Sequence, residues 1–218
     1  MTPFRREYPW ERPTMEDFLQ RAHERFHIFN IKVEELTRAI QSACSFFGIP
    51  YPNMVYDLTN VRGGETMFVN YNRASYGDDV LCYNLTQLRD LGVSSAEAFS
   101  LVMTHECAHR YFQCTQFPGL NNGAWEQELA CDFFMGVRSM TEQIVDIQKV
   151  ANGLGCCGGS RTHPDGQLRV QAIAQGQRTV LYFQENNIAF TMQNFTQAFF
   201  QYCHSIAPTI YAREQQYM

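Results

Sequence analysis

Residues 94–112 read SSAEAFSLVMTHECAHRYF, and this stretch sets the main helix of the fold. Ser94 and Glu97 have the spacing of a capping box, in which the Ser side chain bonds the backbone N–H three residues on and the Glu side chain bonds back. The sequence therefore predicts a helix that begins at Ser94 and continues for about four or five turns, past His109.

The same predicted helix carries HisGluCysAlaHis at 105–109, which fits the H-E-x-x-H pattern. Residues four apart turn through about 400°, so His105 and His109 project side by side and can bind one metal ion. Glu106, about 100° from His105, lies near that ion without binding it, where it can hold a water molecule as a general base. Chance gives this pattern in roughly one such chain in a hundred, so the pattern alone does not establish a metal site.

A third metal ligand is expected on the next helix. A catalytic zinc usually takes three protein ligands and leaves the fourth position to water. The turn-forming segment 117–123 predicts a chain reversal and a helix that starts near Ala124. On that helix we expect Glu128 to bind zinc and Asp132, one turn later, to accept a hydrogen bond from a ligating His. The alternative is that these acids and Glu126 form a solvated helix face.

A glycine-rich loop at 152–160 and the sequence ThrHisProAsp at 162–165 come next. Pro164 suits the first position of a following helix. His163 is a candidate catalytic residue, because a peptidase needs a hydrogen-bond donor for the oxyanion that develops on the attacked carbonyl. A lone loop His is often incidental, and three tyrosines of the expected sheet region are alternative donors: Tyr71, Tyr76 and Tyr83.

The rest of the chain indicates an α+β fold that is mostly helical. Apolar residues repeat at helical spacing in the first third, whereas short runs rich in Val, Tyr and Phe, at 66–71 and 80–83, predict a small sheet. We expect one domain over 1–218, with N-terminal helices at 14–48, a sheet region at 54–83, active-site helices at 94–150, and the glycine-rich loop and C-terminal helices at 151–218.

Composition excludes several classes of protein. The 218 residues, 45% hydrophobic and 18% charged, suffice for one buried core. The net charge is −5 and the Lys and Arg residues are scattered, so nucleic acid is not an expected partner. We find no run of about 18 apolar residues and no secretory signal, and therefore expect no membrane span. Eight Cys in largely apolar surroundings favour reduced thiols in a cytoplasmic protein, and secretion without a classical signal is the alternative.

Together these elements resemble the gluzincin metallopeptidases, most nearly the minigluzincins and the soluble cores of membrane-embedded gluzincins. The likeness covers roughly residues 66–175 and implies a zincin-like fold, in which a small sheet precedes the H-E-x-x-H helix and its edge strand binds the substrate backbone. It also implies the site residues: zinc ligands His105, His109 and Glu128, the base Glu106, the supporting Asp132, and His163 and Arg169 beside the site.

The resulting expectation is a zinc metalloendopeptidase that acts on a peptide or protein substrate through a zinc-bound water activated by Glu106. One alternative is a zinc-binding regulatory or interaction protein without turnover. Another is a latent protease in which Cys156 or Cys157 occupies the open zinc position as a thiolate.

Overall fold

The structure is a computed structural model that describes residues 31–57, 72–73, 79–115 and 123–217. Helices dominate this part of the chain, and a small sheet precedes the helix that carries His105. The strands are β1 (Met54–Asp57), β2 (Asn72–Arg73) and β3 (Asp79–Tyr83). The helices are α2 (Val33–Phe47), α3 (Leu85–Asp90), α4 (Ala96–Thr115), α5 (Ala124–Thr141), α6 (Ile147–Gly155), α7 (Gly166–Glu185) and α8 (Met192–Glu214), followed by the 3₁₀ turn η1 (Gln215–Tyr217).

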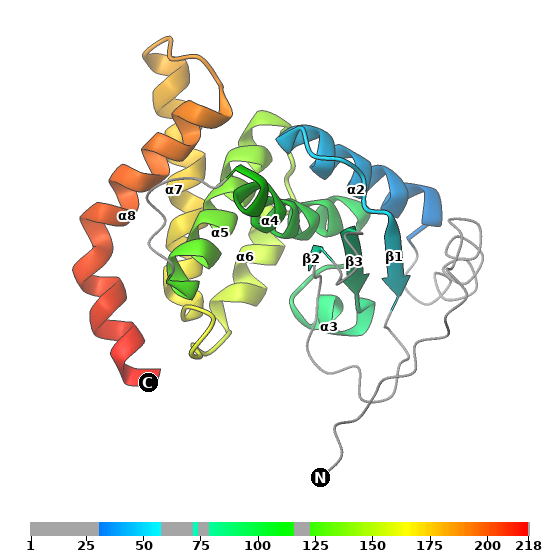
Figure 1. Ribbon diagram of the computed structural model, residues 1–218, viewed down its shortest axis with the longest axis horizontal. Helices are drawn as coiled ribbons and strands as arrows, with labels where there is room; N and C mark the ends of the chain where they lie inside the picture. The colour runs from blue at the N-terminus through cyan, green and yellow to red at the C-terminus, as the bar shows by residue number, and fades with distance from the viewer. Residues whose placement is uncertain (1–30, 58–71, 74–78, 116–122, 218) are drawn as a thin grey trace.

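The helices α2, α4, α5 and α7 pack side by side in that order. Helix α2 packs on α4, α4 on α5, and α5 on α7, while α8 runs along α5 and α7 at the side of the molecule opposite the sheet (Figure 1). Thirteen residues of α5 are buried, including Trp125 and Phe133. These buried residues run from Trp125 to Ser139, so α5 lies in the centre of the fold.

The sheet has the order β1-β3-β2, with β1 parallel and β2 antiparallel to β3. Leu81 and Tyr83, two residues apart on β3, are both buried, as expected for one face of a strand. Tyr83 packs edge-on against Phe99 of α4, with ring centroids 5.6 Å apart, and so attaches the sheet to that helix. The strand expected at 80–83 is confirmed, whereas the run at 66–71 lies outside the described residues.

In the N-terminal region, α2 follows the predicted helical spacing and ends at Gly48. Gly48 adopts a left-handed conformation with φ of 64°, which suits glycine after the last helical turn. The N-terminal helix expected before residue 31 lies outside the described part of the chain. Among the residues that the structure describes, no helix is both long and apolar enough to cross a bilayer.

The start of α4 differs from the prediction by one residue. Ser95, not Ser94, caps the helix, because its Oγ accepts a hydrogen bond from the backbone N–H of Ala98 at 3.0 Å. The Ser95 hydroxyl also donates to the carboxylate of Asp146, which immediately precedes α6. This tertiary contact favours Ser95 over its equally suitable neighbour, and the expected box with Glu97 is wrong.

The predicted loop at 152–160 is also wrong in its first half, because α6 continues to Gly155. Gly153 is required there by packing, since a Cβ on it would lie 2.0 Å from the carbonyl oxygen of Leu91. Helix α7 then begins at Gly166 with Asp165 as its cap, so Pro164 precedes the helix and does not start it.

Glycines allow α5 and α7 to approach each other closely. A Cβ on Gly136 would lie 2.0 Å from the carbonyl oxygen of Ile173, and one on Gly176 would lie 2.0 Å from that of Phe133. Real side chains cannot be accommodated at this distance from backbone atoms unless the helices separate.

We therefore expect Gly176→Ala to lower the free energy of unfolding by about 1–3 kcal/mol, because α5 and α7 must move apart. Urea unfolding followed by circular dichroism measures this change. Gly155→Ala is the control, since its Cβ would meet only Val170 Cγ2 at 3.4 Å. Equal stability of the two variants would show that the α5–α7 contact is not tight.

Candidate metal centre

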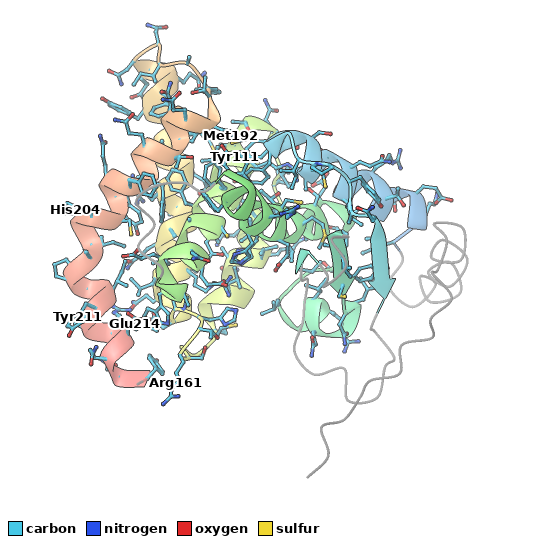
Figure 2. All side chains as sticks on the ribbon, in the orientation of Figure 1. Tyr111, Arg161, Met192, His204, Tyr211 and Glu214 are labelled. Carbon is cyan, nitrogen blue, oxygen red and sulfur yellow. The ribbon has the colours of Figure 1, made fainter. Side chains whose placement is uncertain are left out.

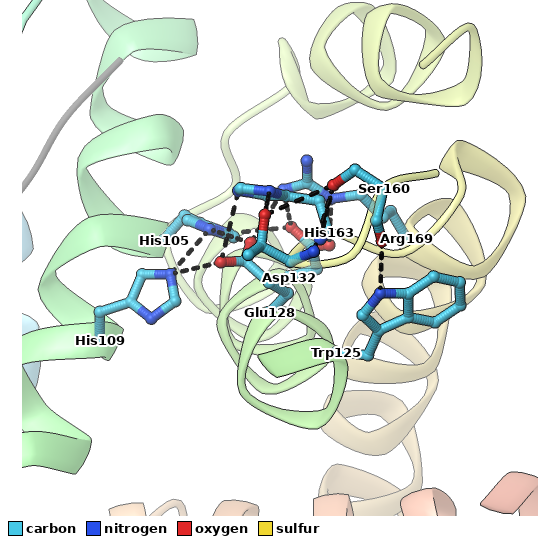
Figure 3. Close-up of polar contacts among 9 residues, drawn as sticks. His105, His109, Trp125, Glu128, Asp132, Ser160, His163 and Arg169 are labelled. Atoms are coloured by element: carbon cyan, nitrogen blue, oxygen red, sulfur yellow. Dashed lines mark hydrogen bonds and ion pairs between the residues drawn. The ribbon is translucent and has the colours of Figure 1, made fainter. Parts of the chain in front are cut away.

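Three predicted ligands meet where α4 packs on α5. The Nε2 atoms of His105 and His109 lie 3.2 Å apart. Glu128 reaches both rings from α5: its Oε2 lies 3.1 Å from His105 Nε2 and its Oε1 lies 3.2 Å from His109 Nε2 (Figure 3). The spacing of four residues along α4 explains the pairing of the rings, and the crossing of the helices brings in the carboxylate.

This spacing fits a zinc ion. Zinc bonded tetrahedrally at about 2.0–2.1 Å has ligand atoms about 3.3 Å apart. The two Nε2 atoms are 3.2 Å apart, and each lies 3.1 or 3.2 Å from a different oxygen of Glu128. Only one proton can lie between the Nε2 atoms of His105 and His109, which are 3.2 Å apart. A cation between His105, His109 and Glu128 would satisfy all three sets of lone pairs at once.

Cys131 is a further potential ligand that the sequence analysis did not assign. His105, His109 and Cys131 each offer a ligand atom within 4.8 Å of the other two. Cys131 is fully buried and follows Glu128 by three residues on α5, a helical spacing that could have drawn attention to it. Each oxygen of Glu128 lies within 3.2 Å of one of the two Nε2 atoms, so Glu128 and Cys131 are both candidates for the third ligand.

Asp132 contacts the Nδ1 side of the His105 ring, and Arg169 in turn contacts Asp132. Asp132 Oδ1 lies 2.9 Å from His105 Nδ1, and the guanidinium of Arg169 donates to Oδ2 at 2.7 Å and to Oδ1 at 2.9 Å. Because Asp132 accepts at Nδ1, that nitrogen carries the proton and Nε2 is directed at the candidate metal position. This is the placement expected for Asp132 and Arg169.

The electrostatics of the centre favour positive charge. Burial by itself would lower the pKa of His105, but Asp132 and Glu128 outweigh it and raise the pKa to about 10. Burial would raise the pKa of Glu128, but hydrogen bonds with His105 and His109 hold it well below its usual range. Burial would raise the pKa of Asp132, but the charges of Arg169 and His105 lower it by more, so the pKa lies below its usual value. Such a cluster is stabilised by any cation placed among its lone pairs.

Glu106 lies beside the three candidate ligands. Burial raises its pKa to about 7, against the opposing effect of His105 and His109. It shares a cavity of about 90 Å³ with His105 and Glu128, enough room for a few water molecules. The remaining wall is mainly apolar and consists of Leu91, Val102, Met135, Val150, Leu154, Cys157, His163 and Arg169.

His163 lies at the rim of this cavity. Its Nε2 is 3.6 Å from Glu128 Oε1, and 52% of its side chain is exposed. Burial lowers its pKa, although Glu128 opposes the shift. The structure thus brings His163 beside the candidate ligands while leaving it accessible to solvent.

The other residues considered from sequence are the tyrosines of the sheet region and the adjacent cysteines. Tyr83 is buried among core residues, and Tyr71 and Tyr76 lie outside the described part of the chain. Of the adjacent cysteines, Cys156 is exposed, whereas Cys157 forms part of the cavity wall. A larger hollow of about 310 Å³ between α2 and the start of α4 has Glu35, Glu97 and Glu142 in its wall together with Arg38 and Arg138, and among the described residues these acids do not gather into a group that could hold a metal ion.

The chain matches no protein-family model, no curated protein and no solved structure.

Replacing Arg169 by Gln should destabilise the protein, because Asp132 has no solvent exposure and would keep its charge without its main partner. The expected loss is about 3–5 kcal/mol of unfolding free energy, measured by urea denaturation. Arg178→Gln is the matched control on α7, since Arg178 is exposed and its guanidinium donates to Gln175 Oε1 of its own helix. A loss no larger than that of the control would mean that the Asp132–Arg169 pair is energetically unimportant.

Proposed function

We propose that the protein is a zinc-dependent peptide hydrolase of the gluzincin type, with a zincin-like arrangement of its helices. The observation that carries this proposal is the convergence of His105, His109 and Glu128 at separations of 3.1–3.2 Å. The resemblance seen in the sequence supports the same residues. A cavity with Glu106 in its wall lies beside the candidate ligands. A catalytic zinc needs such a space for water and substrate, whereas a structural zinc does not.

Each residue then has a defined part in hydrolysis. When bound, zinc would polarise the scissile carbonyl and acidify water. Glu106 takes a proton from the attacking water as the water oxygen bonds the carbonyl carbon of the substrate. It then passes that proton to the leaving amide nitrogen as the C–N bond breaks. His163 is the candidate donor to the carbonyl oxygen as negative charge develops on it. Asp132 and Arg169 keep His105 oriented throughout.

A second candidate function is a structural or regulatory metal centre without turnover. The position of Cys131 favours this alternative, since a thiolate added to His105, His109 and Glu128 would complete four protein ligands and close the site. Latency through a cysteine is a related alternative, and the place of Cys157 in the cavity wall favours it over the exposed Cys156.

Metal content separates these ligand sets. We expect about one zinc per chain by elemental analysis of the purified protein, strongly reduced in Glu128→Gln and retained in Cys131→Ser. Glu126→Gln, on the same helix, is the control. Loss of zinc from Cys131→Ser with retention in Glu128→Gln would replace the proposed set by His105, His109 and Cys131.

Turnover tests the role of Glu106. In Glu106→Gln, zinc should remain bound while cleavage falls by about 10²–10⁴-fold, because the amide cannot accept the proton of water. A mixture of synthetic peptides analysed by mass spectrometry provides the assay. Glu97→Gln, an exposed change on the same helix, should cleave normally. Cleavage by Glu106→Gln at the wild-type rate would exclude this residue as the base, and a zinc-loaded wild type that cleaves no peptide would favour the structural centre.

A further inference from the structure

We propose that the end of α8 and the turn η1 form a latch, made by Arg213 and Tyr217, that positions residues 156–165 and hence His163 beside the candidate metal centre. The effect on catalysis rests on the proposed function, whereas the positioning itself does not. Residues 156–165 contain no helix or strand, so their position depends on contacts with other elements.

Arg213 holds the end of this loop. Its Nη1 donates to both carboxylate oxygens of Asp165, at 2.9 and 3.0 Å, and its Nη2 donates to Gln167 Oε1 at 3.1 Å. Asp165 is also the cap of α7, accepting from the backbone N–H groups of Gln167 and Leu168. Arg169 lies one turn after this cap, so the contact with Arg213 fixes the start of the helix that delivers Arg169 to the centre.

Tyr217 covers the other half of the loop. Its ring centroid lies 5.8 Å from that of Trp125, and a Cβ on Gly159 would lie 2.7 Å from the Tyr217 ring. The indole N–H of Trp125 donates to the carbonyl oxygen of Ser160 at 2.9 Å (Figure 3). The aromatic pair and the small glycine together hold Ser160 in place.

Ser160 connects these contacts to His163. Its Oγ accepts from the backbone N–H of His163 at 3.0 Å, and its own N–H donates to the carbonyl oxygen of His163 at 2.8 Å. At the base of the loop, the N–H of Gly166 donates to the carbonyl oxygen of Cys157 at 2.9 Å. Movement of Ser160 would therefore move His163 with it.

The latch and the metal ligands belong to different parts of the fold. His105, His109 and Glu128 lie on α4 and α5 and contact one another directly, whereas Arg213 bonds Asp165 and Gln167, and Tyr217 meets α5 at Trp125 in its first turn. Release of the latch should consequently displace His163 without removing zinc. This separation distinguishes a positioning role from general destabilisation.

Amide hydrogen exchange of the full-length, zinc-treated protein tests the latch directly. In Arg213→Ala and in Tyr217→Ala, the amides of Ser160, His163 and Gly166 should exchange about tenfold faster, the size expected for losing one strong contact. Tyr217→Phe keeps the ring and should behave as wild type, while Arg213→Lys should be intermediate. Tyr211→Ala is the matched control, because Tyr211 lies on the outer side of α8 and is 65% exposed (Figure 2).

Zinc content and cleavage of the peptide mixture complete the test. Faster exchange confined to the loop, with unchanged zinc and a roughly tenfold lower kcat, supports the latch. Unchanged exchange in both alanine variants, or exchange that also rises throughout α4 and α5, overturns it. If the wild type cleaves no peptide, the proposed function fails, yet the exchange data still decide whether Arg213 and Tyr217 position the loop.

Discussion

One buried carboxylate, that of Asp132, joins the three helices on which the candidate site depends. It lies on α5 and contacts His105 of α4 and Arg169 of α7. Removing a carboxylate from water is costly, and the cost is offset only when its partners are close and well oriented. Each partner comes from a different helix. The His105 ring is therefore correctly oriented only when α4, α5 and α7 are correctly packed.

The close approach of α5 and α7 makes this network possible. Gly136 and Gly176 remove the side chains that would keep the two backbones apart. Arg169 then lies near enough to place its guanidinium on both oxygens of Asp132, at 2.7 and 2.9 Å. Packing of backbone against backbone thus controls the electrostatics of the centre. A cavity lies beside Glu106, and the proposed hydrolysis would use that space.

Local spacing determined much of what the sequence revealed. The helical repeat places His105 beside His109, and Glu128 on the same side as Asp132, whatever the helices later contact. The mostly helical fold and the strand at 80–83 follow from patterns of the same short range. Local rules failed where two residues were equally suitable, as at Ser94 and Ser95, since the choice depended on a contact with Asp146.

By itself, then, the sequence determined which residues share a helix face, because backbone geometry fixes that within a few residues. Only the tertiary structure decided which faces meet. The packing of α5 on α4 brings both Glu128 and Cys131 to the imidazole rings, and the path of the chain after α7 returns Arg213 to Asp165. Contacts between residues so far apart arise from the packing of whole helices, and no short sequence pattern encodes them.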